Sequence, residues 1–429
     1  MIIPCSGYYY PEINKELTSL REICYGHIKE DEKMTTDRRT FIKSIGILGL
    51  AGAMSFGENP SLPFPELVAS GNPGDLGLAH GKAFPGQIRY NLEFYKKWLS
   101  GSGQVSIDHL FELTRGFISV INSHCPSFLE EMDGIARGAG LKLIEIVMIN
   151  ARTDLYAMVE REIAAKKIPA CTSLAMVGKK GAHQYLALGQ NWDWDTLMMK
   201  SPVVLRLRPR EGPELVTLTE AGMLAKIGFN EHRLGVCLNF LSHQTDGKEN
   251  SFGIPIHCLL RVALNSESIH KAIKKITSFP RCASANFLMA QYREGKPLIR
   301  DLELTPEKMA TLEPEGNHLV HTNHFLDPSL AKGCTSGRGP STMNRYRRAR
   351  RIAAQLEHSE PDPVKRMKRV LVSRTDLPYP ISRKGNPDPT STTVAGIIMD
   401  LTGNRMVLTA GPPHENPWVI RPGVGKRSK

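Results

Sequence analysis

The stretch PACTSLAM (169–176), followed downstream by LGQNWDWD (188–195), marks the place where the chain changes from a helical to a strand pattern. Cys171 stands at the expected start of a strand, after the polar segment REIAAKKIP (161–169). Short runs rich in apolar and β-branched residues follow it, separated by Gly, Lys and Pro turns: TSLAMVG (172–178), QYLALGQNWD (184–193), PVVLRLRP (202–209), ELVTLTEAG (214–222), LAKIGFN (224–230) and LGVCLNFL (234–241). This spacing predicts an antiparallel meander that starts at Cys171.

Helical patterns lie on both sides of the meander. Ser106 is a suitable N-cap for a helix over 106–121, and Gly138 and Gly140 fit the C-terminus of the next one. The expected helical segments are 106–121, 127–140, 257–277 and 341–357, and 392–411 reads as a hairpin that turns at Thr402-Gly403-Asn404. Helix pairs around an antiparallel meander indicate an α+β or layered αββα fold rather than a parallel doubly wound sheet.

The composition excludes several classes of protein. The chain has 429 residues, 41% of them hydrophobic, which is too apolar for a disordered chain and too long for a disulfide-stapled miniprotein. No apolar run reaches the roughly 18–20 residues of a membrane span. The net charge of +12 permits a nucleic-acid partner. However, the basic run NRYRRARRIAAQL (344–356) places its apolar residues on one face, so we interpret its arginines as the solvated side of an amphipathic helix and expect no nucleic acid.

Cys171 is the residue whose surroundings point to catalysis. A free cysteine is usually a buried structural residue, and we expect this of Cys125, Cys237, Cys258, Cys282 and Cys334. A cysteine attacks well at neutral pH only if a base removes its proton, because its free pKa is about 8.5. The nearest histidine in sequence, His183, is no close neighbour. Cutting the peptide bond before Cys171 would instead expose an α-amine with a pKa of about 8, so one residue would supply both nucleophile and base.

A series of motifs in a fixed order resembles isopenicillin-N acyltransferase and its bacterial relatives. The motifs are NARTD (150–154), ACTS (170–173), GQNWD (189–193), EAG (220–222) and HTNH (321–324). The resemblance runs from about Gly81 to Trp418 and points to the acyl-CoA:6-aminopenicillanic acid acyltransferase-like family (peptidase C45) of the N-terminal-nucleophile (Ntn) hydrolases. It implies a four-layer αββα fold.

The resemblance also implies roles for particular residues. Cys171 matches the nucleophile, and the Ala170–Cys171 bond matches the point of autocatalytic cleavage. Asp193 matches the aspartate that orients the new α-amine and the sulfur. Asn323 matches the asparagine whose side-chain amide helps to form the oxyanion hole, where removal of one donor typically costs about 10²–10³ in rate.

Five further positions are candidates for supporting roles: Arg152, Gln190, Asn191, Arg383 and Thr390. Gln190 stands where bile-salt hydrolases carry an arginine. Thr390 stands where the acyltransferase carries a catalytic arginine, which puts the specific acyltransferase chemistry in doubt. Arg383, earlier in the chain, is the candidate to fill the same space.

The sequence predicts neither a metal nor a cofactor. His318, His321 and His324 in HLVHTNH belong to an expected strand, where residues three apart point to opposite faces. The Gly-rich stretch GNPGDLGLAHG (71–81) has neither a Walker lysine nor GxGxxG spacing. The eight cysteines form no CxxC pair, which argues against a zinc ribbon or a thioredoxin-type site.

The N-terminal region resembles an export signal. In MTTDRRTFIKSIGILGLAGAM (34–54) two arginines precede a short apolar run and small residues, the pattern of the twin-arginine (Tat) route. We expect a signal peptide over 34–57, a non-native upstream extension over 1–33, and a periplasmic protein. The rest would be one Ntn domain in two fragments, 62–170 and 171–429. A short amphipathic N-terminal helix is the alternative interpretation of 34–54.

The resulting hypothesis is an exported, self-processing cysteine amidohydrolase or acyltransferase that acts through an acyl-Cys171 intermediate. Its substrate would be a small amide, penicillin-like or an N-acyl or peptidyl amine. Its expected partner is its own cleaved fragment, with no stable membrane span. The alternatives are an acyl-CoA-dependent acyltransferase proper, a catalytically impaired binding protein that keeps the fold, and a papain-like protease, whose local cysteine signature is missing.

Overall fold

A computed structural model describes residues 63–160, 162–163, 170–248, 251–335, 339–375, 377–385 and 388–425. The expected upstream extension (1–33) and the expected Tat signal (34–57) lie outside the described residues, as does most of the polar segment before Cys171. The architecture below is that of the unit from residue 63 onward.

The first sheet is almost entirely antiparallel. It has eight strands in the order β1-β4-β5-β6-β7-β8-β9-β10, and only its edge pair β1–β4 is parallel. The strands are β1 (Glu66–Gly71), β4 (Pro202–Pro209), β5 (Leu215–Glu220), β6 (Ile227–Asn230), β7 (Leu234–Phe240), β8 (Ala285–Arg293), β9 (Lys296–Leu304) and β10 (Met309–Leu312).

The second sheet contains the strand that begins at the cysteine motif. Its order is β11-β2-β3-β12-β13-β14, and all neighbouring strands are antiparallel. The strands are β2 (Ala170–Lys180), β3 (His183–Asp195), β11 (His318–His321), β12 (Ser391–Asp400), β13 (Arg405–Ala410) and β14 (Val419–Pro422).

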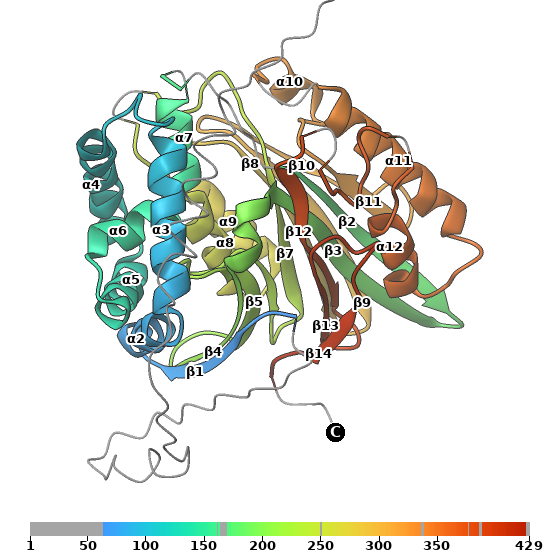
Figure 1. Ribbon diagram of the computed structural model, residues 1–429. Helices are drawn as coiled ribbons and strands as arrows, with labels where there is room; N and C mark the ends of the chain where they lie inside the picture. The colour runs from blue at the N-terminus through green and yellow to red at the C-terminus, as the bar shows by residue number, and fades with distance from the viewer. Residues whose placement is uncertain are drawn as a thin grey trace, which may run out of the picture. The chain divides into compact units, whose positions relative to one another are not determined.

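Helices cover the outer faces of the two stacked sheets (Figure 1). The larger helical layer lies on the first sheet: α2 (Pro73–Ala83), α3 (Pro85–Leu99), α4 (Ile107–His124), α5 (Pro126–Ala139), α6 (Leu143–Asn150), α7 (Arg152–Val159), α8 (Ile256–Leu264) and α9 (Ile269–Ser278). The second sheet is covered by α11 (Pro340–Leu356) and α12 (Pro363–Leu371). Two short elements are η2 (Thr196–Lys200) and α10 (Pro328–Ala331). The predicted α+β class and αββα layering are therefore confirmed.

Local sequence signals account for the element boundaries. Ser106 Oγ accepts the His109 N–H at 3.1 Å and begins α4, and Gly140 ends α5 at a φ of 65°, in the left-handed region. The expected helix over 257–277 is instead two helices, because the chain breaks after α8 and Ser268 caps the start of α9. The predicted hairpin is formed by β12 and β13 around residues 401–404.

Glycines allow α2 and α5 to pack with almost no space between their backbones. A Cβ added to Gly77 would lie 1.9 Å from the Glu131 carbonyl oxygen, and one added to Gly134 would lie 2.5 Å from the Gly74 carbonyl oxygen. The Gly-rich stretch 71–81 therefore packs one helix against another. Within the described residues, no helix combines the length and the apolar character needed to cross a membrane.

Candidate active site

Cys171 lies at the start of β2, buried between the two sheets. It pairs with Trp192 across the β2–β3 ladder, and Ala170 pairs with Asp193. The side chain of Cys171 is 4% exposed. The antiparallel register thus places the bond before Cys171 directly beside the GQNWD motif, as the shared motif order predicts.

Asn323 holds the backbone nitrogen of Cys171. The N–H of Cys171 donates to Asn323 Oδ1 at 2.9 Å, and Asn323 Nδ2 donates to the Phe240 carbonyl at 3.0 Å. The backbone N–H of Asn323 in turn donates to Thr342 Oγ1 at 2.8 Å, which ties this loop to helix α11. These hydrogen bonds therefore fix the orientation of the Asn323 side-chain amide. Its oxygen faces the nitrogen of the Ala170–Cys171 bond, which we expect to be cut.

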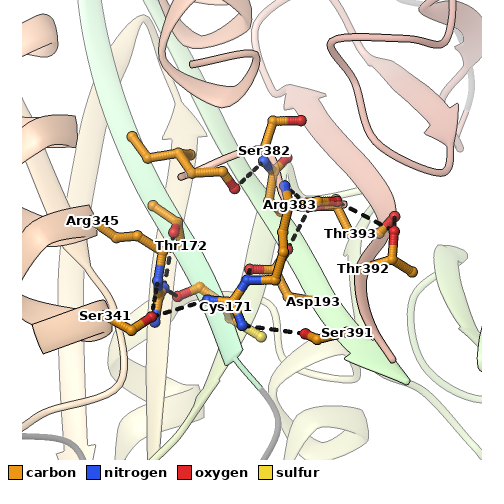
Figure 2. A network of polar contacts seen from close by, with 12 residues as sticks. Cys171, Thr172, Asp193, Ser341, Arg345, Ser382, Arg383, Ser391, Thr392 and Thr393 are labelled. Atoms are coloured by element: carbon orange, nitrogen blue, oxygen red, sulfur yellow. Dashed lines mark hydrogen bonds and ion pairs between the residues drawn. The ribbon is translucent and has the colours of Figure 1, made fainter. Parts of the chain in front are cut away.

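Asp193 is paired across the ladder with Ala170, the other residue of this bond, and belongs to a network shown in Figure 2. Its Oδ1 accepts a hydrogen bond from Thr393 Oγ1 at 2.6 Å, and its Oδ2 lies 3.8 Å from Arg383 Nε. Burial raises the pKa of Asp193, and the charges of Arg383 and Arg345 oppose that rise. Asp193 is thus a buried carboxylate whose charge depends on two arginines.

Arg383, the candidate to replace the missing family arginine, reaches the site. Its guanidinium donates to Ser391 Oγ at 3.2 Å and to Ser341 Oγ at 3.0 Å, close to Asp193. Thr390 is exposed, and its hydroxyl donates to Asp388 Oδ1 at 2.7 Å. The structure therefore brings Arg383 to the site and leaves Thr390 outside it.

The interpretation of the basic run as a solvated helix face is wrong for Arg345. This side chain is 1% exposed, and its Nη1 donates to the Cys171 carbonyl and to Thr172 Oγ1, the latter at 3.0 Å. Its Nη2 donates to Asn323 Oδ1 at 3.0 Å. Arg345 lies on the buried face because the carbonyl and amide oxygens of the site supply acceptors there, which an apolar-face pattern does not reveal.

Gln190 and Asn191 connect layers of the fold. Gln190 Nε2 donates to the Leu238 carbonyl at 2.7 Å, and Gln190 Oε1 accepts the Leu238 N–H at 3.0 Å, which joins β3 to β7 of the other sheet. Asn191 Nδ2 donates to the carbonyls of Leu371 and Ile381 at 2.8 and 3.0 Å. These contacts fix the strand that carries Asp193, and none of them involves Cys171.

A small cavity is lined by the Cys171 side chain and by part of a charge cluster, of which only Arg152 was a candidate from the sequence. Arg152, Trp192 and Lys226 line it together with Cys171. Its free space is about 20 Å³, room for about one water molecule. Trp192 therefore forms part of the wall beside the cysteine. A charged lysine within the apolar segment LAKIGFN, and the glutamate of EAG, were the sequence signals for this cluster.

Glu220 is the centre of the cluster. Its Oε1 accepts from Arg152 Nη2 at 2.8 Å and from Lys226 Nζ at 2.6 Å, and the Tyr95 hydroxyl donates to its other oxygen. Burial alone would raise the pKa of Glu220, but the two cations lower it to about 2. The cluster thus places two buried cations in the wall of the cysteine cavity and pairs both with one carboxylate behind them.

The thiol of Cys171 is not activated by its surroundings alone. Burial and the Asp193 carboxylate raise its pKa to about 11, although Lys226 and Arg345 lower it in part. At neutral pH the sulfur is therefore protonated, and any attack by it requires a proton acceptor.

The histidines of HLVHTNH have protein partners. Nε2 of His321 lies 2.9 Å from Glu303 Oε1, and Nδ1 of His318 lies 3.5 Å from Glu357 Oε2. In the described part of the chain, no three His, Cys, Asp or Glu side chains are grouped so as to hold a metal ion.

Comparisons with known proteins agree with the motif order. A family model described as acyl-coenzyme A:6-aminopenicillanic acid acyl-transferase matches residues 178–415. The chain is also 28% identical over 355 residues to the acyl-coenzyme A:6-aminopenicillanic-acid-acyltransferase 40 kDa form of Emericella nidulans, covering 82% of this chain and 94% of that protein. Protein dcd1A of Dictyostelium discoideum is 30% identical over 167 residues, covering 37% of this chain and 36% of that protein.

Solved structures with similar folds are more distant. The Caenorhabditis elegans ortholog of N-acylethanolamine-hydrolyzing acid amidase matches 54% of this chain and 93% of its own, with 18% identity and a TM-score of 0.38. Penicillin V acylase from Agrobacterium tumefaciens matches 56% of this chain and 83% of its own, with 17% identity and a TM-score of 0.31. Likenesses at this level have no bearing on the reaction.

Proposed function

We propose the following reaction on the premise that this chain belongs to the acyl-coenzyme A:6-aminopenicillanic acid acyl-transferase family. The protein is a self-processing cysteine enzyme that hydrolyses or transfers the acyl group of a small amide. Cys171 is its nucleophile, and its substrate is penicillin-like or an N-acyl or peptidyl amine. The observation that carries this proposal is the position of the Ala170–Cys171 bond, with Asn323 hydrogen-bonded to its nitrogen and Asp193 paired opposite Ala170.

The first event is a cut in the chain itself. The Cys171 sulfur attacks the Ala170 carbonyl, the acyl group moves from nitrogen to sulfur, and water hydrolyses the resulting thioester. Ala170 then carries a carboxylate, and Cys171 carries a free α-amine. Asn323 Oδ1, which accepts the N–H of this residue in the intact chain, remains in position to accept from the new amine.

In turnover the α-amine takes the proton of the Cys171 thiol, directly or through a water, and the sulfur attacks the substrate carbonyl. Asp193 orients the amine, because a carboxylate beside an amine favours its ammonium form. A side-chain N–H of Asn323 stabilises the oxyanion. The acyl-cysteine then passes its acyl group to water or to an amine.

The balance between hydrolysis and transfer follows from the compartment. We propose that the chain is exported by the Tat route and acts in the periplasm. Coenzyme A thioesters are scarce outside the cytoplasm, so amide hydrolysis is the favoured reaction there. Arg383, beside Asp193, supplies a positive charge that Thr390 does not, which favours an active enzyme over an impaired binding protein.

A denaturing gel with intact-mass measurement tests the self-processing step. Protein produced from Met34 should give two bands whose masses match cleavage between Ala170 and Cys171, and Cys171→Ala should give one. Cys237→Ala, a buried cysteine of the first sheet, is the matched control and should still give two. A single full-length band for the unaltered protein, stable over days, would reject self-processing.

The amide substrate is tested on the processed protein. Penicillins, N-acyl amino acids and small peptidyl amides are each incubated with it, and release of the free amine is followed. The processed form should release amine from at least one class, and Cys171→Ala should release none.

A further inference from the structure

The proposed reaction leaves one proton unaccounted for. In turnover the α-amine of Cys171 accepts the thiol proton, but before the chain is cut that nitrogen belongs to an amide and cannot act as a base. Burial raises the pKa of the thiol to about 11, so the proton does not leave unaided. The first cut therefore needs an acceptor that is present in the intact chain.

Lys226 lines the same cavity as Cys171. Its side chain ends in an amine, the same chemical group as the Cys171 α-amine that does not exist before the cut. Its Nζ lies 3.3 Å from the centre of the Trp192 ring, and Trp192 is the residue paired with Cys171 across β2 and β3. The positive charge of Lys226 lowers the pKa of the Cys171 thiol more than that of Arg345 does, although Arg345 donates to the Cys171 carbonyl. A cysteine thiolate correspondingly raises the pKa of Lys226.

Burial of Lys226 favours partial loss of its proton, and the charges around it act in both directions. Burial is the largest cause and lowers the pKa of Lys226 to about 8, with the charge of Arg152 acting in the same direction. Glu220, hydrogen-bonded to Nζ at 2.6 Å, acts in the opposite direction. His257 of α8 faces the same cluster, and its pKa is lowered well below the ordinary range by burial, so it stays neutral. The Tyr95 hydroxyl, which donates to Glu220, has a raised pKa and stays neutral as well.

We propose that the side-chain amine of Lys226 accepts the Cys171 thiol proton in the first, self-processing cut. The neutral amine takes the proton from sulfur, directly or through the one water for which the cavity has room. The sulfur then forms a bond to the Ala170 carbonyl carbon, and the bond from that carbon to the Cys171 nitrogen breaks. The departing nitrogen receives the proton from the Lys226 ammonium and becomes the α-amine. Water then hydrolyses the thioester, which restores the thiol and leaves Ala170 with a carboxylate.

Asp193 is the other acceptor within the site. Burial raises the pKa of Asp193, but its carboxylate also receives a hydrogen bond from Thr393 and lies against Arg383, and both contacts favour its ionised form. A carboxylate held by an arginine is a poor acceptor for a thiol proton, whereas an amine with a pKa of about 8 lies much closer to the thiol. Lys226 is therefore the better match, and Asp193 serves as the alternative that the experiment distinguishes.

The inference rests on the proposed function. The experiment measures the rate at which the full-length band is lost, between pH 6 and 10, for the full chain and for two variants. Lys226→Gln removes the amine, whereas Lys226→Arg keeps the positive charge but cannot release a proton near neutral pH. For the full chain we expect a rate that rises through about pH 8. Because a positioned general base contributes about 10²–10⁴-fold, we expect both variants to process at least about 100-fold more slowly and to lose that rise.

The outcomes separate this inference from the proposed function. If the full chain does not process at all, the proposed function fails. The role of Lys226, but not the proposed function, is overturned if either variant processes at a rate within about threefold of the full chain. It is also overturned if the rate of the full chain shows no inflection between pH 6 and 10. If Asp193→Asn abolishes processing while Lys226→Gln processes at the unaltered rate, Asp193 is the acceptor of the thiol proton. Thermal unfolding of each variant, compared with Cys171→Ala, verifies that the protein is folded, and the full-chain pH profile decides if neither variant folds.

Discussion

Replacing Arg345 by methionine should slow self-processing without unfolding the protein. Arg345 donates to the carbonyl of Cys171 and to Oδ1 of Asn323, so one buried guanidinium sets the relative positions of the nucleophile residue and the amide that holds its nitrogen. Methionine fills a similar volume but donates no hydrogen bond. The amide of Asn323 would then be held by its bonds to the Phe240 carbonyl and the Cys171 N–H.

The magnitude follows from the bonds that are lost. Of the hydrogen bonds that the guanidinium donates in the site, two hold Cys171 and Asn323. Hydrogen bonds to charged groups contribute ~1.5–3 kcal/mol each, so the loss of these two predicts about 3–6 kcal/mol. Burial lowers the pKa of Arg345 to about 10, which shows that its charge is costly to keep in this site, and methionine removes that cost. We therefore expect the lower end, about 3 kcal/mol, which corresponds to a processing rate roughly 100-fold lower.

The assay is the rate at which the full-length band disappears, measured at fixed pH for both proteins. Arg347→Met is the matched control, because Arg347 is exposed on the same helix, and it should process at the unaltered rate. Thermal unfolding monitors the fold. If Arg345→Met processes within threefold of the unaltered protein while remaining folded, positioning of Cys171 by this guanidinium is refuted.

Three other changes test separate parts of the structure. Arg383→Met removes the cation beside Asp193, so the Asp193 pKa should rise further and amide turnover should fall by about 10- to 100-fold, measured as kcat/KM against pH. Burial raises the pKa of Asp154 to about 8, so near neutral pH it keeps its proton in the folded protein but not in the unfolded one. Its contribution to stability is therefore complete below about pH 4 and is lost as the pH rises through 8. Asp154→Asn should flatten this loss of stability, measured by urea unfolding at pH 5, 7 and 9. Gly77→Ala should lower stability by about 3 kcal/mol or more because its Cβ would overlap a backbone oxygen of α5, whereas Gly86→Ala, with open space around it, should not lower it; equal melting temperatures would contradict the close helix packing.

The fold was predictable from the sequence wherever its signals are local. The N-cap at Ser106 and the helical spacing of Leu110 and Phe117 predict α4. The run PVVLRLRP coincides with β4. Residues 257–277 were predicted as one helix because their hydrophobic period continues through a break that only the cap at Ser268 marks. Local periodicity thus predicts which elements form better than where they are interrupted.

The site was predictable only where a motif carried it. Cys171, Asp193 and Asn323 come together as the motif order implies, but Arg345 contacts Cys171 from 174 positions away in the chain. A basic helix with one apolar face gives no indication that one of its arginines has buried acceptors, since those acceptors belong to other strands. Lys226 was missed although its partner Glu220 is only six positions away, because its place beside the cysteine depends on the stacking of the two sheets.

The pairing of β1 with β4 determines how the processed protein would unfold and refold. β1 and helices α2–α7 precede Cys171, yet β1 is hydrogen-bonded to a strand that follows it, and the helices cover the sheet built from that later part of the chain. A cut at Ala170 would therefore leave two chains that share one sheet. Refolding of the intact precursor is a first-order process, whereas reassembly of the cut protein is second order and depends on concentration. Once cut, the protein would have a melting temperature that falls on dilution. After denaturation at low concentration the cut enzyme would fail to regain activity, whereas precursor refolded at the same concentration would still become active.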